Sequence, residues 1–276
     1  MKKIHLAYSK LYNAGDIMNV DIVEKLSNRQ VQHSRTFSAE MIAIGGAIYG
    51  LQYSDIWYKK VYQNILHIIY DKKPIYVWGS GFWHDFNHNR LFRNNIVVCA
   101  LRGKKTQKKL YDITGNYYDV PLADAGLLID MLIAPDIEKK YKIGIIPHMS
   151  QQEENSFKKM ASQEGTRIIN IRDTPANVAA EIVSCEAVVS SSLHGLIFAD
   201  ALHIPNLHVL GEKELTEGNF KFEDYYSSYG KADNFVRLSD HIPSFDEIVD
   251  NYQIDAAEVN NKKRQLIECF PKELRG

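Results

Sequence analysis

Short apolar runs alternate with amphipathic segments along most of the chain. In the first half, strand patterns cover residues 3–9, 41–47, 74–81 and 96–102, and helical patterns cover 20–27, 58–73 and 104–113. Short continuous apolar runs are typical of strands covered on both faces, whereas apolar positions spaced by three or four residues indicate helices. The alternation predicts a parallel sheet with helices on both faces.

The second half of the chain repeats this alternation. Strand patterns cover 141–149, 166–171, 187–192 and 204–210, and helical patterns cover 152–165, 174–185 and 193–202. Residues 134–141 contain a proline, several charges and no regular apolar spacing, so they predict a linker. We therefore expect an α/β protein of two Rossmann-like domains, 1–136 and 137–276, that face a central cleft, with a terminal helix over 255–270 packing back across one half.

Charge and cysteine content narrow the possible partners. The 33 basic and 34 acidic residues give a formal net charge of -1, which predicts no overall field that would recruit nucleic acid. Any anion site is therefore expected to be local. The three cysteines are far apart and lie in apolar contexts, which predicts reduced thiols in a cytoplasmic protein.

The N-terminal segment predicts a strand. Two lysines are followed by an apolar run of only about five residues that contains His5, which is too short for the apolar region of a signal peptide. No stretch reaches the roughly 20 apolar residues of a membrane span. Any contact with a membrane is therefore expected to be peripheral.

Glycine-containing motifs follow the first four predicted strands. They are NAGD (13–16), GGAIYG (45–50), WGSGF (78–82) and LRGKKT (101–106). Loops at the ends of parallel strands present helix N-termini that attract anions, and glycine lets the backbone approach a ligand closely. Each motif alone is also typical of a tight turn, but four at equivalent positions favour an anion site in the cleft.

Signatures of common cofactors are absent from the sequence. It contains no Walker loop, and no G-x-G-x-x-G motif follows the first strand. His84, Asp85 and His88 have a spacing typical of metal ligands, but zinc needs at least a third ligand, and the polar neighbours suit a solvated loop equally well. We therefore expect neither a metal nor a cofactor.

One histidine stands between a serine-rich strand end and an apolar helix, in SSSLHG (190–195) followed by LIFADALHIP (196–205). This stretch resembles a signature near the C-terminus of the polysaccharide pyruvyl transferase family. The family's other motifs have counterparts in the same order, namely NAGD, GGAIYG, WGSGF, LRGKKT, DAGLL, IPHMS, INIRDTP and KFEDYYSS. The resemblance therefore extends over nearly the whole chain.

The resemblance implies a GT-B-like fold and transfer of pyruvate from phosphoenolpyruvate to a hexose as a cyclic ketal, with release of phosphate. Phosphoenolpyruvate would be a co-substrate, and no cofactor would be needed. The acceptor would belong to a capsular or exopolysaccharide repeat unit, linked to polyprenyl diphosphate at the inner face of the cytoplasmic membrane. A sugar-nucleotide-dependent GT-B glycosyltransferase and a non-catalytic sugar-binding scaffold stay open as alternatives.

The resemblance and the charges of phosphoenolpyruvate also indicate site residues. His194, His148 and Asp224 are candidates for proton transfer, and whether His194 acts as acid, base or anion anchor stays open. The donor-binding candidates are Arg102, Arg172, Leu193, His194, Lys221, Gly79 and Ser80. The acceptor-binding candidates are Asn13, Asp16, Gly45, Gly46, Tyr225 and Tyr226.

The chain departs from the family pattern at Ser192, where many members carry arginine directly before the Leu-His pair. Arg172 and Lys221 are the candidates to replace that arginine. From the residues alone, His194 also fits a packed helical residue, and 221–230 also fits a structural loop rich in aromatic side chains.

Overall fold

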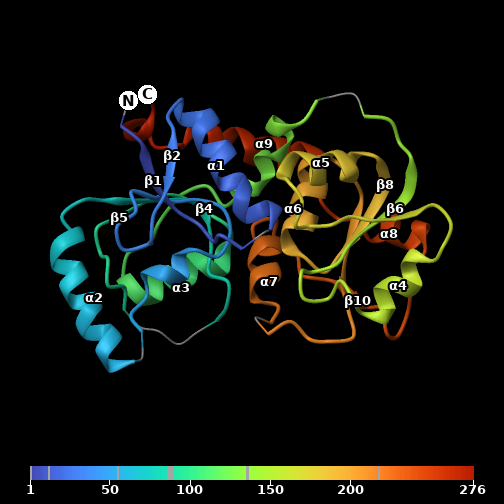
Figure 1. Cartoon of the computed structure of the whole chain (residues 1–276), viewed down its shortest axis with the longest axis horizontal. Helices are drawn as coiled ribbons and strands as arrows, with labels where there is room; N and C mark the ends of the chain where they lie inside the picture. The colour runs from blue at the N-terminus through green and yellow to red at the C-terminus, as the bar shows by residue number, and fades with distance from the viewer. Residues whose placement is uncertain (1, 12, 55, 86–89, 135–136, 217) are drawn as a thin grey trace.

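The chain forms two parallel β-sheets with helices packed around them (Figure 1). The structure is a computed structural model that describes residues 2–11, 13–54, 56–85, 90–134, 137–216 and 218–276. The first sheet contains β1 (Ile4–Ala7), β2 (Val31–His33), β3 (Met41–Ile42), β4 (Ile75–Ser80) and β5 (Ile96–Leu101). The second contains β6 (Tyr141–Ile146), β7 (Thr166–Ile168), β8 (Cys185–Ser190), β9 (Asn206–Leu210) and β10 (Phe235–Arg237).

Helices connect most of the strands. The first half contains α1 (Ala14–Ser27), the 3₁₀-helix η1 (Ile48–Leu51), α2 (Trp57–Tyr70), α3 (Lys104–Thr114) and the 3₁₀-helix η2 (Ala125–Leu132). The second half contains α4 (Asn155–Ala161), α5 (Pro175–Val183), α6 (Leu193–Ala201), α7 (Phe220–Ser227), α8 (Phe245–Asn251), α9 (Ala256–Glu268) and the 3₁₀-helix η3 (Lys272–Leu274). Among the residues described, no helix has the length and apolar character needed to cross a bilayer.

The two sheets have the same strand order. The first runs β2-β1-β3-β4-β5, and the second runs β7-β6-β8-β9-β10, with parallel pairing throughout. The direction of winding therefore changes between β1 and β3 in one sheet and between β6 and β8 in the other. Ligands of open α/β sheets bind in the crevice that forms at such a change, beyond the carboxyl ends of the strands. The prediction of two Rossmann-like halves is confirmed, and each half has one such crevice.

Capping residues determine where several helices begin. The side chain of Asn13 accepts a hydrogen bond from the N–H of Gly15 at 3.0 Å, so α1 begins at Ala14, earlier than the residue 20 predicted from apolar spacing. Thr174 caps α5, with Pro175 in its first turn. The polar cap thus extends α1 beyond its periodic apolar part, whereas α5 begins where its pattern predicted.

Some short elements differ from those predicted. The predicted strand over 41–47 is only two residues long, and β2, β10 and α8 have no counterpart among the predicted segments. Residues 221–230 form most of α7 and the turn after it, where a structural loop was one expectation. Very short strands have too few residues for an alternating pattern to appear.

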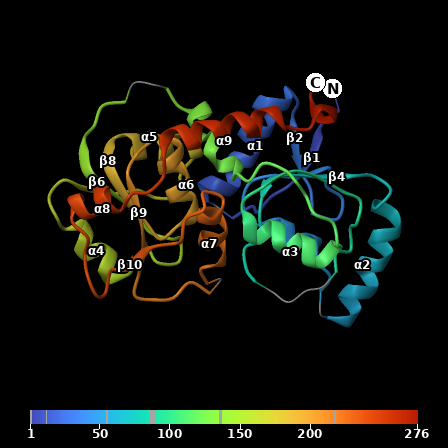
Figure 2. The ribbon, with the colours of Figure 1, turned by 180° about the vertical axis from the view of Figure 1, so that it is seen from behind.

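Helix α9 ties the two halves together at the back of the molecule (Figure 2). The ammonium group of Lys262 donates to the carbonyl of Leu122 at 2.8 Å and to that of Ser228 at 2.9 Å, so it contacts both halves. The indole N–H of Trp78 in β4 donates to the carbonyl of Leu266 at 2.9 Å. The terminal helix thus packs against both halves.

The expected domain boundary after residue 136 falls between η2 and β6. Residues 135–136 lie outside the described part of the chain. Helix η2 packs against α1 of the first half and against α5 and α6 of the second. The exact division into domains therefore stays a prediction.

Candidate active site

A cavity of about 730 Å³ lies between the two halves. Its walls include the loops after β1 and β3 in the first sheet and after β6 and β8 in the second. These are the two crevices that the shared strand order creates. Both sheets therefore direct their ligand-binding edges into one space large enough for a donor and a sugar.

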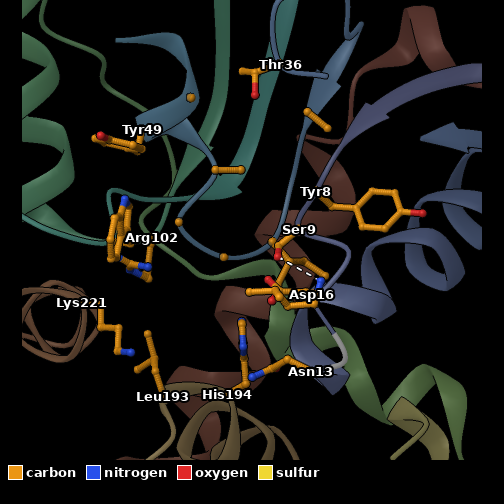
Figure 3. A pocket seen from close by; sticks show the side chains of 18 of the residues that line it. Tyr8, Ser9, Asn13, Asp16, Thr36, Tyr49, Arg102, Leu193, His194 and Lys221 are labelled. Atoms are coloured by element: carbon orange, nitrogen blue, oxygen red, sulfur yellow. Dashed lines mark hydrogen bonds between the residues drawn. The ribbon is translucent and has the colours of Figure 1, made fainter. Parts of the chain in front are cut away.

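The first turns of α1 and α6 meet at this cavity (Figure 3). The ring of His194 in α6 lies against Gly15 in α1 so closely that a Cβ atom on Gly15 would be 2.0 Å from the Cγ atom of His194. The N–H of Ala14 also donates to the carbonyl of Ile171 across the same interface, at 2.8 Å. Two helix N-termini, each the positive end of a dipole, therefore face one space.

The cavity lining carries more positive than negative charge. Among the described residues that line it, Arg35, Arg102 and Lys221 are cationic, and Asp16 is the one carboxylic acid. Lys221 lies beside Leu193 and His194 at one end of the cavity, and Thr36 lies at the opposite end (Figure 3). An anionic group is therefore attracted to the end formed by α6 and α7.

His194 is held in its neutral form. Burial, helped by the positive charges of Lys221 and Arg102, lowers its pKa from the usual 6.5 to about 3. Its Nε2 atom is buried and has no hydrogen-bond partner among the described residues. Because buried polar atoms are normally paired, this nitrogen is a candidate contact for a bound ligand.

Asp16 shows the opposite shift. Burial raises the pKa of its carboxyl group to about 7, with repulsion from Asp124 adding to the effect and attraction by Lys221 opposing it. Its Oδ1 atom is 3.3 Å from the point where a Cβ of Gly45 would lie, and the Cε1 atom of His194 is 3.9 Å from the same point. Asp16 and His194 therefore both border Gly45, the first partly protonated at neutral pH and the second uncharged.

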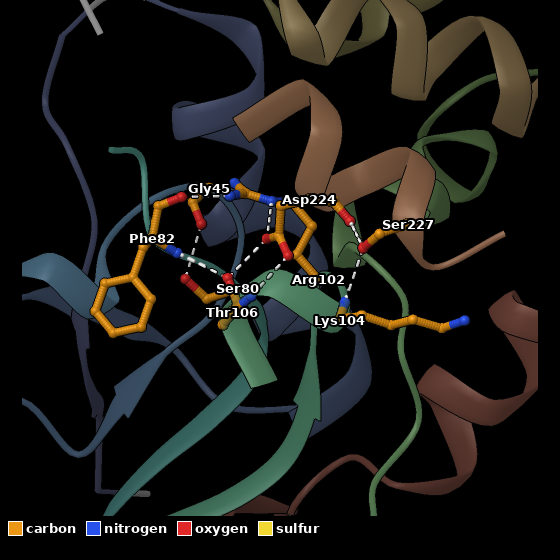
Figure 4. A network of polar contacts seen from close by, with 8 residues as sticks. All are labelled: Gly45, Ser80, Phe82, Arg102, Lys104, Thr106, Asp224 and Ser227. Atoms are coloured by element: carbon orange, nitrogen blue, oxygen red, sulfur yellow. Dashed lines mark hydrogen bonds and ion pairs between the residues drawn. The ribbon is translucent and has the colours of Figure 1, made fainter. Parts of the chain in front are cut away.

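A buried ion pair holds Arg102 at the cavity wall (Figure 4). Its Nε atom donates to Oδ2 of Asp224 at 2.9 Å, and the two side chains are 1% and 0% exposed. The Asp224 carboxylate also accepts from the N–H of Thr106 at 2.8 Å and from its hydroxyl group at 2.7 Å. The guanidinium group donates in addition to the carbonyl of Phe82. Asp224 thus orients Arg102 and fastens α7 to α3.

Most of the predicted site residues meet in this cavity. Those in its lining are Asn13, Asp16, Gly45, Gly46, Arg102, His148, Leu193, His194 and Lys221. Those outside its lining are Gly79, Ser80, Arg172, Asp224, Tyr225 and Tyr226.

Arg172, Gly79 and Ser80 are placed away from the cavity for separate reasons. Arg172 is exposed in the turn before α5, so Lys221 is the candidate of the two that reaches the cavity. Gly79 and Ser80 lie inside β4, where the hydroxyl group of Ser80 donates to the carbonyl of Gly45 at 2.8 Å. Ser80 therefore supports the loop that forms the cavity wall.

Asp224 and Tyr225 of α7 are buried inside the protein, and Lys221 is the residue of α7 that lines the ligand space. Both oxygens of Asp224 accept hydrogen bonds from Arg102 and Thr106, so this carboxylate positions the arginine and is not placed to contact a substrate. The hydroxyl group of Tyr225 donates to Asp200 at 2.6 Å inside the second half. Tyr226 lines a separate small cavity beside β9. The expected sugar-binding wall is therefore not formed by these two tyrosines.

The lining also contains residues that were not among the predicted site residues. They are Tyr8, Ser9, His33, Arg35, Thr36, Tyr49, Trp83 and Met149, among others. Tyr8 and Ser9 follow β1 directly, so their position at a strand end was a usable signal. Arg35 and Thr36 follow β2, and they were missed because that strand itself was not predicted.

The metal-like spacing of His84, Asp85 and His88 is not supported by the described residues. His88 lies outside them. Asp85 pairs with Lys109 at 2.9 Å. Within the described part of the chain, no group of three or more His, Cys, Asp or Glu side chains is arranged to hold a metal ion.

Residues 5–212 match the family model of the polysaccharide pyruvyl transferases. The chain belongs to this family. The resemblance inferred from the ordered motifs is thereby confirmed, and membership of the pyruvyl transferase family supports a role in pyruvyl transfer in polysaccharide biosynthesis.

Two curated proteins are similar in sequence to this pyruvyl transferase family member. The uncharacterised protein L143 of Acanthamoeba polyphaga mimivirus is 30% identical over 207 residues, which are 71% of this chain and 71% of that protein. The succinoglycan biosynthesis protein ExoV of Rhizobium meliloti (strain 1021) is 24% identical over 155 residues. That match covers 56% of this chain and 47% of ExoV.

Two solved glycosyltransferase structures are similar to this pyruvyl transferase family member over most of its length. The spinosyn rhamnosyltransferase SpnG has a TM-score of 0.39 and 10% identity, covering 96% of this chain and 95% of that one. The calicheamicin glycosyltransferase CalG4 has a TM-score of 0.40 and 11% identity, covering 98% and 95%.

The buried ion pair leads to a prediction about stability. Asp224→Asn should lower the free energy of unfolding by about 3 kcal/mol or more, because it leaves the Arg102 guanidinium buried without a counter-charge. Urea unfolding followed by circular dichroism measures the change. The matched control is Asp112→Asn, which removes an exposed pair with Lys108 and should cost less than about 1 kcal/mol. Equally small changes in both variants would contradict the role given to Asp224.

The pKa of His194 leads to a prediction about acid sensitivity. The unfolded ring binds a proton below its usual pKa of 6.5, whereas the folded ring does so only below about 3. Stability due to the neutral ring is therefore lost as the pH falls from about 6.5 to 3, by up to about 1.4 kcal/mol per pH unit. His194→Gln should unfold with a shallower pH dependence in this range, as measured by urea unfolding at several pH values. Parallel profiles would show that the ring is not held neutral.

Proposed function

We propose that this protein transfers pyruvate from phosphoenolpyruvate to two hydroxyl groups of a saccharide, forming a cyclic ketal and releasing phosphate. The observation that carries the proposal is the convergence of two helix N-termini, Arg102 and Lys221 on one cavity that also contains Asp16 and His194. Phosphoenolpyruvate has a phosphate and a carboxylate, and both groups favour such positive surroundings.

The anionic end of the donor is expected to bind at the first turn of α6. Ser192 makes no side-chain cap at this turn, which leaves the first backbone N–H groups of the helix for a ligand. Lys221 lies at the same end of the cavity and supplies the positive charge that many family members obtain from arginine at position 192. Arg102 adds a second cation, held in place by Asp224.

Ketal formation needs one proton at the methylene carbon of the donor and removes a proton from each of two sugar hydroxyl groups. In balance, one hydroxyl proton replaces the proton given to carbon, and the other leaves with phosphate. Asp16 suits the transfer of a proton to the methylene carbon, because a carboxyl group with a pKa of about 7 is protonated in a large fraction of molecules at neutral pH. His194 suits the removal of a proton from a sugar hydroxyl group, because a bound anion raises the pKa of a neutral ring and lets it accept a proton.

The acceptor is expected to occupy the opposite end of the cavity. Tyr49 and Trp83 pack edge to face there, with ring centroids 5.6 Å apart, and Thr36 lines the same region. Aromatic rings pack against the apolar faces of sugars, and hydroxyl side chains exchange hydrogen bonds with sugar hydroxyl groups. The proposed acceptor region is therefore on the first half and not on α7.

The proposed acceptor is a hexose in a lipid-linked repeat unit of a capsular or exopolysaccharide, carried on polyprenyl diphosphate. The reaction would then take place in the cytoplasm at the inner face of the membrane. The proton balance closes with the donor, the acceptor and the side chains of the cavity, so the proposed reaction includes no cofactor.

The donor assignment can be tested with purified protein. Phosphoenolpyruvate and a panel of synthetic and lipid-linked glycans should give phosphate release in step with ketal formation, as measured by a phosphate assay and mass spectrometry.

Lys221→Gln should weaken phosphoenolpyruvate binding roughly thirtyfold or more, because losing one charged partner of a buried anion costs about 2 kcal/mol or more. Calorimetry measures this affinity. The control is Lys213→Gln, at an exposed lysine outside the cavity lining. Binding of nucleotide sugars without any response to phosphoenolpyruvate would instead indicate a glycosyltransferase.

The role of Asp16 can be tested by the pH dependence of the rate. A step that uses its proton slows as the pH rises through the pKa of about 7, or somewhat higher with the anionic donor bound. Asp16→Asn should lower kcat about a hundredfold or more and remove this alkaline decline, while phosphoenolpyruvate still binds in calorimetry. An asparagine variant with near-native kcat and the same decline would assign the proton transfer to another group.

A further inference from the structure

Helix α2 exposes its apolar side to solvent. Trp57 and Ile68 are 76% and 71% exposed, and the other exposed apolar or aromatic residues of the helix are Tyr58, Val61, Tyr62, Ile65 and Ile69. At the spacing of an α-helix these side chains form one continuous side. All residues of α2 are described, and Leu66 is the buried one.

The polar side of α2 attaches the helix to the rest of the protein. Gln63 accepts a hydrogen bond from the N–H of Ser54 at 2.8 Å and donates to the carbonyl of Gln52 at 3.1 Å. The Nδ1–H of His67 donates to the carbonyl of Phe92 at 2.6 Å. A surface helix usually buries its apolar side, so the orientation of α2 is reversed. A contiguous exposed apolar surface of this kind indicates an interaction site.

The ends of α2 are basic. Lys59 and Lys60 lie in its first turn, and Lys72 and Lys73 follow its last turn, and all four are exposed. Asp71 is the one acidic residue between positions 56 and 73. Its carboxylate accepts hydrogen bonds from the backbone N–H groups of residues 94 and 95, at 2.7 and 3.0 Å. The apolar side is therefore flanked by positive charge at both ends.

We propose that α2 docks on an anionic membrane surface. A helix with aliphatic and aromatic side chains on one side and lysines at its ends lies in the plane of the interface, where the apolar side enters the acyl boundary and the lysines contact anionic headgroups. Trp57, Tyr58 and Tyr62 are of the residue types that favour this depth. The docking would be peripheral, since the polar side of the helix stays on the protein.

A second copy of the chain matches this surface less well. In an antiparallel twofold pairing of α2 with itself, the lysines at one end of each helix would face the lysines at the other end of its partner. Asp71 can offset only one of the four lysine charges of each helix. Anionic headgroups provide the negative charge that a second α2 lacks.

Helix α2 is connected to the acceptor end of the cavity. The chain runs from Tyr49 in the cavity lining into α2, and the hydroxyl group of Tyr53 donates to Asn64 at 2.8 Å. The ring of Phe37 packs against that of Tyr70 with centroids 5.6 Å apart. The helix lies at the outer end of the first half, away from the second (Figure 1). Docking would thus bring a lipid-linked saccharide close to the cavity. This consequence rests on the proposed function, whereas the docking of α2 on a membrane is independent of it.

Flotation of the full chain with lipid vesicles tests the proposal. Binding to vesicles of phosphatidylcholine and phosphatidylglycerol in equal parts should exceed binding to pure phosphatidylcholine about tenfold or more, and it should weaken with added salt. The double variant Trp57→Ser, Ile68→Ser should bind the anionic vesicles about tenfold more weakly or worse, because it removes the two most exposed apolar side chains of α2. Lys59→Gln, Lys60→Gln should have an effect of similar size.

The matched control is Tyr117→Ser, Lys231→Gln, at exposed positions outside α2, and it should bind like the native protein. Circular dichroism and Tm verify that each variant is folded. Equal binding to both kinds of vesicle, or native binding by the α2 variants, would overturn the proposal. So would a dimer in light scattering that Trp57→Ser, Ile68→Ser abolishes, since α2 would then be covered by a second copy. The assay contains neither phosphoenolpyruvate nor glycan, so its failure is distinct from a failure of pyruvyl transfer.

Discussion

The close contact between the His194 ring and the backbone of Gly15 determines how the two halves meet. It brings the N-termini of α1 and α6 to the same point, so that the crevice of each sheet opens into one cavity. Asp16 and His194 are both half-buried beside this contact. Desolvation then disfavours the charged forms of both His194 and Asp16, which lowers the pKa of one and raises that of the other. The contact therefore contributes to both the shape and the electrostatics of the site.

Glycines in the sequence motifs serve the contact between the halves as well as the ligand space. A Cβ atom on Gly103 of LRGKKT would lie 1.7 Å from the carbonyl oxygen of Asp224, just as one on Gly15 of NAGD would collide with His194. The motifs were interpreted as anion-binding loops. A glycine in a sequence indicates that another group comes close to the backbone, but it does not show whether that group is a ligand or a part of the protein. A ligand in the cavity and the packing at the interface both require a position without a side chain, so glycine suits either.

The sequence pattern predicted the two parallel sheets because buried strands and amphipathic helices leave strong periodic signals. It predicted the place of His194, Asp16 and Lys221 less directly, through motifs at strand ends and a family resemblance. Asp224 and Tyr225 were placed in the ligand space because their motif gave no indication of which side of α7 faces inward. Their hydrogen-bond partners, Arg102 and Asp200, are distant in sequence, and no local pattern encodes such contacts.

The attachment of α9 to both halves has a consequence for turnover. Hinge opening would have to break the hydrogen bonds of Lys262, the contact of Trp78 with α9 and the pair of Arg102 with Asp224 together. Leaving such buried groups unpaired costs several kcal/mol. We therefore expect ligands to enter and leave through the cavity mouth while the halves stay together.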